Sequence, residues 1–168
     1  MPNSVAAARA LEPLIIAARP DFDRDRSLPE SLVDAMTDAG LFRIWLPESM
    51  GGAEVPPLDA LKTWEELARQ DGSAGWCATI AGGYARLAGA MDKDAALEVF
   101  GTGRGIVAGS LNPTGKAVAV PGGYRISGRW TYGSFIAYAD WVLGNCIADD
   151  GTGSLKGADG GPDFRLCL

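Results

Sequence analysis

Apolar side chains recur at helical spacing through the first hundred residues. From about residue 5 to residue 19 they appear every three or four positions, at Leu11, Leu14, Ile15 and Ala18. Pro13 must then lie near the start of a helix or impose a kink, because its ring fits only the first turn. Ser27-x-x-Glu30 has the pattern of a capping box and predicts a second helix, which Gly40 ends.

A third apolar stripe follows Pro56-Pro57 and is predicted to be core. Its members are Leu58, Leu61, Trp64, Leu67 and Ala68. The next segment, residues 73–91, is rich in glycine and alanine and long enough to raise the question of a membrane span. Arg86 and the glycines within it favour a buried helix that packs closely against its neighbours. Asp92 is placed to cap a last helix, which runs to Phe100.

Beyond Gly101 the apolar pattern changes to period two, which is typical of strands. Five strands are predicted, separated by Pro and Gly turns, at Ile106–Leu111, Ala117–Val120, Tyr124–Trp130, Trp141–Ala148 and Asp163–Leu168. They are too few to close a barrel. The fold class is therefore predicted as α+β, with a helical N-terminal domain at residues 1–103 and an incomplete antiparallel β-barrel domain at residues 104–168.

Composition narrows the function classes. The chain has 168 residues, of which 47% are hydrophobic and 21% charged, as in globular proteins. Its net charge of -6 argues against nucleic acid as a partner, because phosphate binding needs clustered Lys and Arg. The N-terminus lacks the apolar core of a signal peptide, so the cytoplasm is the expected location and no membrane association is expected.

Metal and hydrolytic chemistry find little support. Cys77, Cys146 and Cys167 are far apart, and the chain has no His, so they indicate buried thiols and neither a zinc site nor a disulfide framework. The acidic run from Asp21 to Arg26 lacks the Gly and Glu of a calcium loop. Without His there is no Ser-His-Asp triad, and demanding chemistry would fall to a cofactor.

Three stretches resemble the acyl-CoA dehydrogenase superfamily. They are Leu41–Gly52, Glu65–Trp76, and Gly122–Trp130 followed by Ala139-Asp140-Trp141. The resemblance implies a helical N-terminal domain, a β-barrel middle domain and a C-terminal helical bundle that supplies the catalytic base. No residue follows Leu168 to supply that bundle, so the sequence indicates an interrupted form, and no catalytic residue is assigned within it.

The resemblance also implies a flavin site, for FAD or reduced FMN, on the middle domain. The family's Thr-Glu-Pro segment corresponds to Leu111-Asn112-Pro113, and its Trp-Ile-Thr segment to Tyr132-Gly133-Ser134. By this correspondence Ser134 hydrogen-bonds the flavin ring, Tyr132 packs beside it, and the backbone near Leu111 meets its polar edge. The alternative is that Tyr132 and Ser134 are ordinary residues at a strand end.

Departures from the family pattern at Leu111, at Thr114–Ala117 and at Tyr132 weaken the case for a dehydrogenase of acyl-CoA. The runs Asn112–Ala117 and Ser127–Trp130, with a downstream Ser, resemble the two-component flavin hydroxylases, which share the fold and use reduced flavin from a partner reductase. That branch is preferred, with a small-molecule substrate and a homo-oligomer expected. Two alternatives stay open, namely an acyl-CoA dehydrogenase and a non-catalytic interaction module. Trp76 and Tyr84 either line a substrate cavity or, as large aromatic residues usually do, pack in the core.

Overall fold

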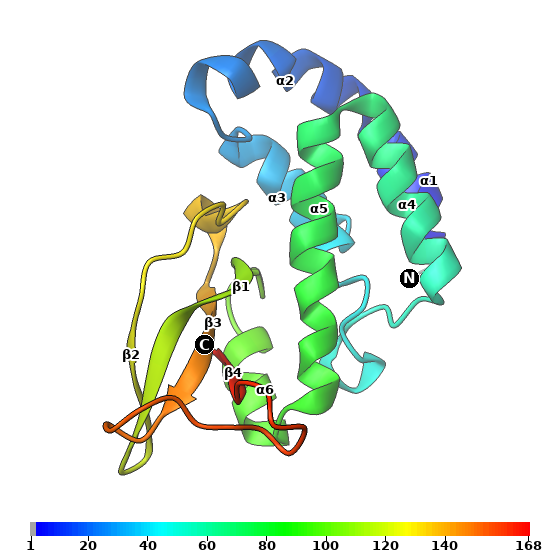
Figure 1. The fold of residues 1–168 in the computed structure, drawn as a ribbon. Helices are drawn as coiled ribbons and strands as arrows, with labels where there is room; N and C mark the ends of the chain where they lie inside the picture. The colour runs from blue at the N-terminus through cyan, green and yellow to red at the C-terminus, as the bar shows by residue number, and fades with distance from the viewer. Residues whose placement is uncertain (1–2) are drawn as a thin grey trace. The chain divides into compact units, whose positions relative to one another are not determined.

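The computed structural model describes residues 3–168, which form two compact units. The helical unit comprises the residues up to Val107 together with Ala137–Asp140, and the strand unit comprises Ala108–Ile136 and Trp141–Leu168. Helices and strands are segregated along the chain, which confirms the predicted α+β class (Figure 1). The domain boundary between residues 103 and 104 stays a prediction.

Six α-helices and three 3-10 helices make up most of the helical unit. The α-helices are α1 Ser4–Ala10, α2 Glu12–Asp25, α3 Glu30–Asp38, α4 Pro57–Gln70, α5 Gly72–Ala85 and α6 Lys93–Phe100, and the 3-10 helices are η1 Leu41–Arg43, η2 Glu48–Met50 and η3 Arg86–Ala90. Pro13 lies in the first turn of α2, so the predicted first helix is divided at Leu11. Gly40, with φ of 70°, ends α3 as predicted.

The predicted capping box at Ser27 is wrong. Helix α3 begins at Glu30 with Pro29 as its N-cap, and no side chain caps it. The hydroxyl of Ser27 donates instead to the carbonyl of Leu28, at 3.4 Å. The ring of Pro29 fixes φ near the value of a helix start, so the chain enters the helix after the proline and leaves the serine outside.

The predicted core stripe of α4 is correct only in part, because Leu58 and Leu61 are 61% and 56% exposed. The buried face of α4 consists of Ala60, Thr63, Trp64, Leu67 and Gln70. Its two polar members bind α1, which lies against α4 in Figure 1: the hydroxyls of Ser4 and Thr63 are 2.7 Å apart, and Gln70 donates to the carbonyl of Ala8 at 3.0 Å. Satisfied hydrogen bonds allow polar groups in a core where hydropathy alone would place leucines.

Helices α4 and α5 pack side by side through small residues (Figure 1). The buried face of α5 consists of Ala74, Gly75, Ala78, Ala81, Gly82 and Ala85. A Cβ atom on Gly75 would lie 2.6 Å from the Cα of Ala68, so the two backbones touch at this point. The carboxylate of Asp71 starts α5 by accepting from the amide of Ser73 at 2.8 Å. Among the described helices, none is long and apolar enough to cross a membrane.

The strand unit carries an open four-stranded sheet in the order β2-β1-β3-β4. The strands are β1 Val107–Val120, β2 Gly123–Ser127, β3 Trp141–Asp149 and β4 Phe164–Cys167, and the β1/β2 and β3/β4 pairs are antiparallel. The sheet confirms the incomplete β-domain. Two predicted strands are one, however, because β1 continues through Pro113. The proline is tolerated there because β1 pairs with β2 only from Lys116 onward.

The close approach at Gly75 predicts opposite effects of alanine at two positions of α5. Gly75→Ala places a methyl against the backbone of α4, and overpacking of this kind costs about 1–3 kcal/mol of stability. Gly83→Ala is the matched control: its new Cβ meets nothing within 4 Å, and loss of a glycine inside a helix stabilises by about 0.5–1 kcal/mol. Urea unfolding followed by circular dichroism measures both. Equal stability of the two variants would contradict the packing described here.

Glu66 joins α1 and α4 through two arginines. Its carboxylate lies 2.7 Å from Arg69 and 3.2 Å from Arg9, and its side chain is only 11% exposed. Hydrogen bonds from Arg69, and then from Arg9, lower the pKa of Glu66 to about 2. Because the folded pKa lies below the ordinary value of 4.5, these ion pairs stabilise the fold above about pH 4.5 and are lost as the pH falls toward 2.

The variant Glu66→Gln is therefore expected to unfold more easily than the wild type at neutral pH, and the difference is expected to shrink as the pH falls. Glu65→Gln, on the outward side of the same helix, is the control and should track the wild type throughout. Urea midpoints measured from neutral to acid pH test this. A gap between wild type and Glu66→Gln that stays constant across that range contradicts the assignment.

Candidate functional site

The first predicted flavin segment, Leu111-Asn112-Pro113, lies inside β1. The side chain of Leu111 is 56% exposed, and its backbone carbonyl accepts a hydrogen bond from the side-chain amide of Asn145 at 2.8 Å. The backbone amide of Asn112 donates a longer hydrogen bond to the hydroxyl of Ser110, at 3.3 Å. One backbone group of this segment is thus fixed by a side chain from the neighbouring strand β3.

The second predicted segment, Tyr132-Gly133-Ser134, lies in the loop between β2 and η4 Ile136–Tyr138. Tyr132 and Phe135 have φ of 61° and 66°, the left-handed region that side chains with a Cβ rarely adopt. The amide of Ser134 donates to the carbonyl of Tyr132 at 2.9 Å. Tyr132 is 92% exposed, whereas Phe135 is buried. The loop thus displays one aromatic side chain and buries the next, in a backbone conformation that its surroundings must stabilise.

Trp130 fixes the start of this loop. Its indole lies in a slot between three glycines, since a Cβ added to Gly115, Gly128 or Gly144 would meet the ring at 2.1, 2.9 and 2.8 Å respectively. The indole Nε1 donates to the backbone carbonyl of Asn145 at 2.9 Å. The slot admits the ring only because these strand positions lack side chains.

Asn145 therefore connects the two predicted segments. Its carbonyl accepts from Trp130, which opens the loop to Ser134, and its side chain donates to Leu111. Sequence reasoning missed this residue, because a single Asn in a strand gives no local signal. The role of Trp130 could have been found from Gly115, Gly128 and Gly144, whose spacing around one large aromatic residue indicates a packing slot.

The segment Ala137–Asp140 belongs to the helical unit and is held there by both its backbone and its side chains. The hydroxyl of Tyr138 donates to the carbonyl of Leu28 at 2.6 Å, and the guanidinium of Arg104 lies 5.7 Å from the centre of the Tyr138 ring. Asp140 accepts from the amide of Ile106 through its carboxylate, at 2.9 Å, and its own amide donates back to the carbonyl of Ile106, at 2.8 Å. This reciprocal pair explains why an Asp stands before Trp141.

The two aromatic residues predicted to line a substrate cavity, Trp76 and Tyr84, both lie on α5. Trp76 is 55% exposed, so its predicted alternative role in core packing is wrong. The cause is the close approach of α4 and α5, which leaves room only for alanine and glycine on the buried face. Tyr84 is half-buried, and burial raises the pKa of its phenol. Their place in a substrate cavity stays a prediction.

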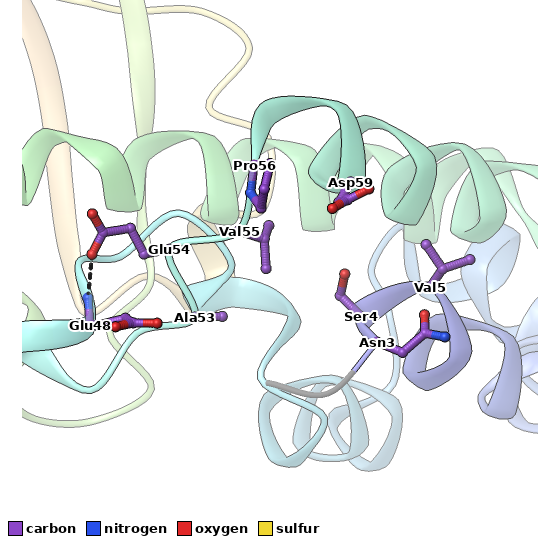
Figure 2. Close-up of a pocket in the computed structure, with 9 residues that line it drawn as sticks. All are labelled: Asn3, Ser4, Val5, Glu48, Ala53, Glu54, Val55, Pro56 and Asp59. Atoms are coloured by element: carbon purple, nitrogen blue, oxygen red, sulfur yellow. Dashed lines mark hydrogen bonds between the residues drawn. The ribbon is translucent and has the colours of Figure 1, made fainter.

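A separate pocket of about 440 Å³ lies in the helical unit, away from all the predicted site residues of that unit. Figure 2 shows the nine residues that line it: Asn3, Ser4, Val5, Glu48, Ala53, Glu54, Val55, Pro56 and Asp59. The carboxylate of Glu54 accepts from the amide of Glu48 at 2.8 Å and so closes the turn at η2. That carboxylate therefore has a structural role at the start of η2.

The residues considered as metal ligands form ion pairs within a helix or are buried or half-buried thiols. Asp21 and Asp25 lie in α2 and pair with Arg24 at 2.6 and 2.7 Å. Burial raises the pKa of Cys77 to about 12 and that of Cys146 to about 11, as expected of unreactive thiols. Within residues 3–168, no group of three His, Cys, Asp or Glu could hold a metal ion.

The residues of the strand unit suit a neutral, planar ring system. None of the six predicted contact residues is charged, and they offer a hydroxyl, backbone amides and an exposed aromatic face. Such groups hydrogen-bond and stack against a ring without placing a fixed charge beside it. The donor set therefore fits a flavin ring.

Residues 6–91 match the family described as acyl-CoA dehydrogenase, N-terminal domain. The chain belongs to the acyl-CoA dehydrogenase family. The match lies within the helical unit and confirms the resemblance seen in the sequence. Helices α4 and α5 both fall inside the matched range.

Relatives within the family extend the similarity beyond the matched range. An indole-3-acetate monooxygenase from Pseudomonas putida is 33% identical over 146 residues, which cover 83% of this chain and 37% of that protein. The oxygenase subunit HsaA of a flavin-dependent monooxygenase from Mycobacterium tuberculosis is 32% identical over 128 residues, which cover 75% of this chain and 32% of that protein. The chain thus spans less than half the length of these relatives.

Solved structures show the same similarity over both units. The HsaA monooxygenase from M. tuberculosis superimposes with a TM-score of 0.86 at 28% identity, covering 98% of this chain and 42% of that one. XiaF from a Streptomyces species, in complex with FADH2 and glycerol, gives a TM-score of 0.82 at 28% identity and covers 97% of this chain and 40% of that one. The helical and strand units of this family member are therefore both represented in known monooxygenases.

The slot around Trp130 predicts the cost of filling it. Gly115→Ala would place a methyl 2.1 Å from the indole and 2.7 Å from the sulfur of Cys146, and is expected to destabilise the strand unit by about 1–3 kcal/mol. Gly123→Ala, on the adjoining strand, meets nothing within 4 Å and is the control. Urea unfolding followed by tryptophan fluorescence measures both. If Gly115→Ala is as stable as the control, the slot does not determine the position of Trp130.

Proposed function

We propose that this chain forms part of the flavin site of the oxygenase component of a two-component monooxygenase. The observation that carries the proposal is similarity to named monooxygenases through both units, with HsaA covering 98% of the chain. Bound reduced flavin would supply the electrons with which one oxygen atom of O2 enters a small-molecule substrate and the other leaves as water. The protein's own residues would bind and orient the ring.

The strand unit is proposed to hold the ring. Ser134 would hydrogen-bond it, Tyr132 would stack beside it, and the backbone at Leu111-Asn112-Pro113 would meet its polar edge. The exposure of Tyr132 and the absence of charge at these positions support these roles. Trp76 and Tyr84 of α5 are proposed to line the substrate cavity, and no residue of this chain is assigned as a catalytic base.

Reduced FAD is the proposed flavin, in preference to FMN. The XiaF structure holds FADH2, and an FADH(2)-dependent resorcinol hydroxylase from Rhizobium is 29% identical over 119 residues. The FMN-bound structure of TdsC from Paenibacillus is only 18% identical and supports the shared fold alone. A flavin reductase is the proposed partner, because relatives are named as oxygenase subunits or components. Assembly into homo-oligomers and a cytoplasmic location remain predictions.

The family match leaves acyl-CoA dehydrogenation as a second candidate, since the family is named for it. The two activities separate in one assay on a protein that contains this chain. Oxygen-dependent hydroxylation with added reduced flavin indicates the monooxygenase, and oxidation of an acyl-CoA with an electron acceptor in the absence of oxygen indicates the dehydrogenase. The monooxygenase is preferred because the relatives described above are monooxygenases and hydroxylases.

Flavin binding by residues 1–168 tests the proposal. Under anaerobic conditions, reduced FAD is expected to bind and to raise the melting temperature, because a ligand of the folded state stabilises it. Ser134→Ala is expected to weaken binding about tenfold, the effect of one lost hydrogen bond of about 1.4 kcal/mol.

Ser127→Ala, an exposed serine of β2, is the control and should bind as the wild type does. Absence of any flavin-induced rise in melting temperature, even with reduced FAD in large excess, would overturn the proposed function. Equal binding by Ser134→Ala and Ser127→Ala would overturn the role of Ser134 alone.

A further inference from the structure

Asn145 makes one hydrogen bond to the Leu111–Pro113 segment and another to Trp130, two residues before the Tyr132–Ser134 loop segment. It lies in β3, opposite Leu166 of β4, and is half-buried. Its backbone carbonyl accepts from the indole of Trp130 at 2.9 Å, and its side-chain amide donates to the carbonyl of Leu111 at 2.8 Å. We propose that Asn145 is a positioning residue that sets the spacing between the Leu111–Pro113 segment and the Tyr132–Ser134 loop. This inference rests on the proposed flavin site.

The link to the loop is rigid. One edge of the Trp130 indole is closely confined, because a Cβ added to Gly115, Gly128 or Gly144 would lie 2.1, 2.9 or 2.8 Å from its Cζ2 or Cη2 atom. Close packing of this kind restricts the movement of the ring. Asn145 follows Gly144 directly, so the carbonyl that accepts from the indole is part of the slot wall. The hydrogen bond from its indole therefore attaches Trp130, two residues before Tyr132, to strand β3. Strand β2 ends earlier, at Ser127.

The link to Leu111 depends on the side chain of Asn145. Its Nδ2 reaches a carbonyl on the neighbouring strand, while its Oδ1 is buried and finds no donor within residues 3–168. A buried acceptor without a donor raises the free energy of the folded state. The hydrogen bond from Nδ2 to the Leu111 carbonyl therefore holds the amide in this orientation. Aspartate has no donor to offer the Leu111 carbonyl, and alanine and serine do not reach it.

The consequence for a bound ring is geometric. A planar ligand that contacts two backbone segments at once needs both within about 0.5 Å of the correct positions. The side chain of Asn145 adds a hydrogen bond from β3 to the Leu111 carbonyl beyond the pairing of the strands themselves. Its loss is therefore expected to loosen the Leu111 segment while the loop stays attached to the slot. Flavin affinity should then fall although no residue in contact with the flavin has changed.

The test compares Asn145→Ala and Asn145→Ser with the control Tyr124→Phe, which removes a hydrogen bond that Arg165 donates at 3.2 Å elsewhere in the strand unit. Two readouts are taken on the full chain. Hydrogen exchange by mass spectrometry, without flavin, reports on residues 109–114 and 130–136. Anaerobic titration with reduced FAD reports affinity. Serine retains a polar side chain at the site, so it gives a result if the alanine variant fails to fold.

Both Asn145 variants are expected to speed exchange in residues 109–114 and to weaken FADH2 binding about tenfold, whereas Tyr124→Phe should change binding less than twofold. A double-mutant cycle with Trp130→Phe should be non-additive in affinity, because both changes act on one linked unit. Wild-type binding with unchanged affinity in both Asn145 variants, or strict additivity in the cycle, overturns the inference. Failure of the wild type to bind overturns the proposed function, and with it this role, while altered exchange would then report a purely structural link.

Discussion

The glycine slot around Trp130 is the contact on which the strand unit depends. A four-stranded open sheet has little interior of its own, and the half-buried indole of Trp130 adds to it. The ring fits because residues 115, 128 and 144 are glycines. A side chain at any of Gly115, Gly128 or Gly144 would occupy the space of the indole. The hydrogen bond from the indole Nε1 to the carbonyl of Asn145 fixes the orientation of the ring. The loop that follows takes its starting point from this contact.

In the helical unit, too, small residues allow a close contact, here between helices α4 and α5. Helices α4 and α5 approach until Gly75 meets the backbone of Ala68, and this distance excludes large side chains from their shared face. The large apolar side chains Leu58, Leu61 and Trp76 of these two helices lie on their exposed surfaces instead. Where the packing does admit polar groups, as at Thr63 and Gln70, the Thr63 hydroxyl and the Gln70 amide nitrogen form hydrogen bonds to α1. Small and hydrogen-bonded residues thus take the place of large apolar ones on this face.

The sequence predicted the order and class of the elements because periodicity and capping are local. Pro13, Gly40 and Asp92 marked helix ends correctly. It failed where distant contacts decide, as in the leucines of α4, whose orientation depends on which neighbours α4 meets. The joining of two predicted strands into β1 was missed for the same reason, since only the pairing partners show that β1 continues through Pro113. Of the site, the resemblance supplied candidate residues, but Asn145 could not be found because its two partners lie far away in sequence.

The assignment of Ala137–Asp140 to the helical unit has a practical consequence for dissecting this protein. The chain passes from one unit to the other at three places, so neither unit is a continuous stretch of sequence. A gene cut after Val107 would separate Tyr138 and Asp140 from Leu28, Arg104 and Ile106, and would leave the carbonyl and amide of Ile106 without their partners. Expressing the helical unit alone therefore requires that this short return segment be grafted back by a linker or a permuted chain order.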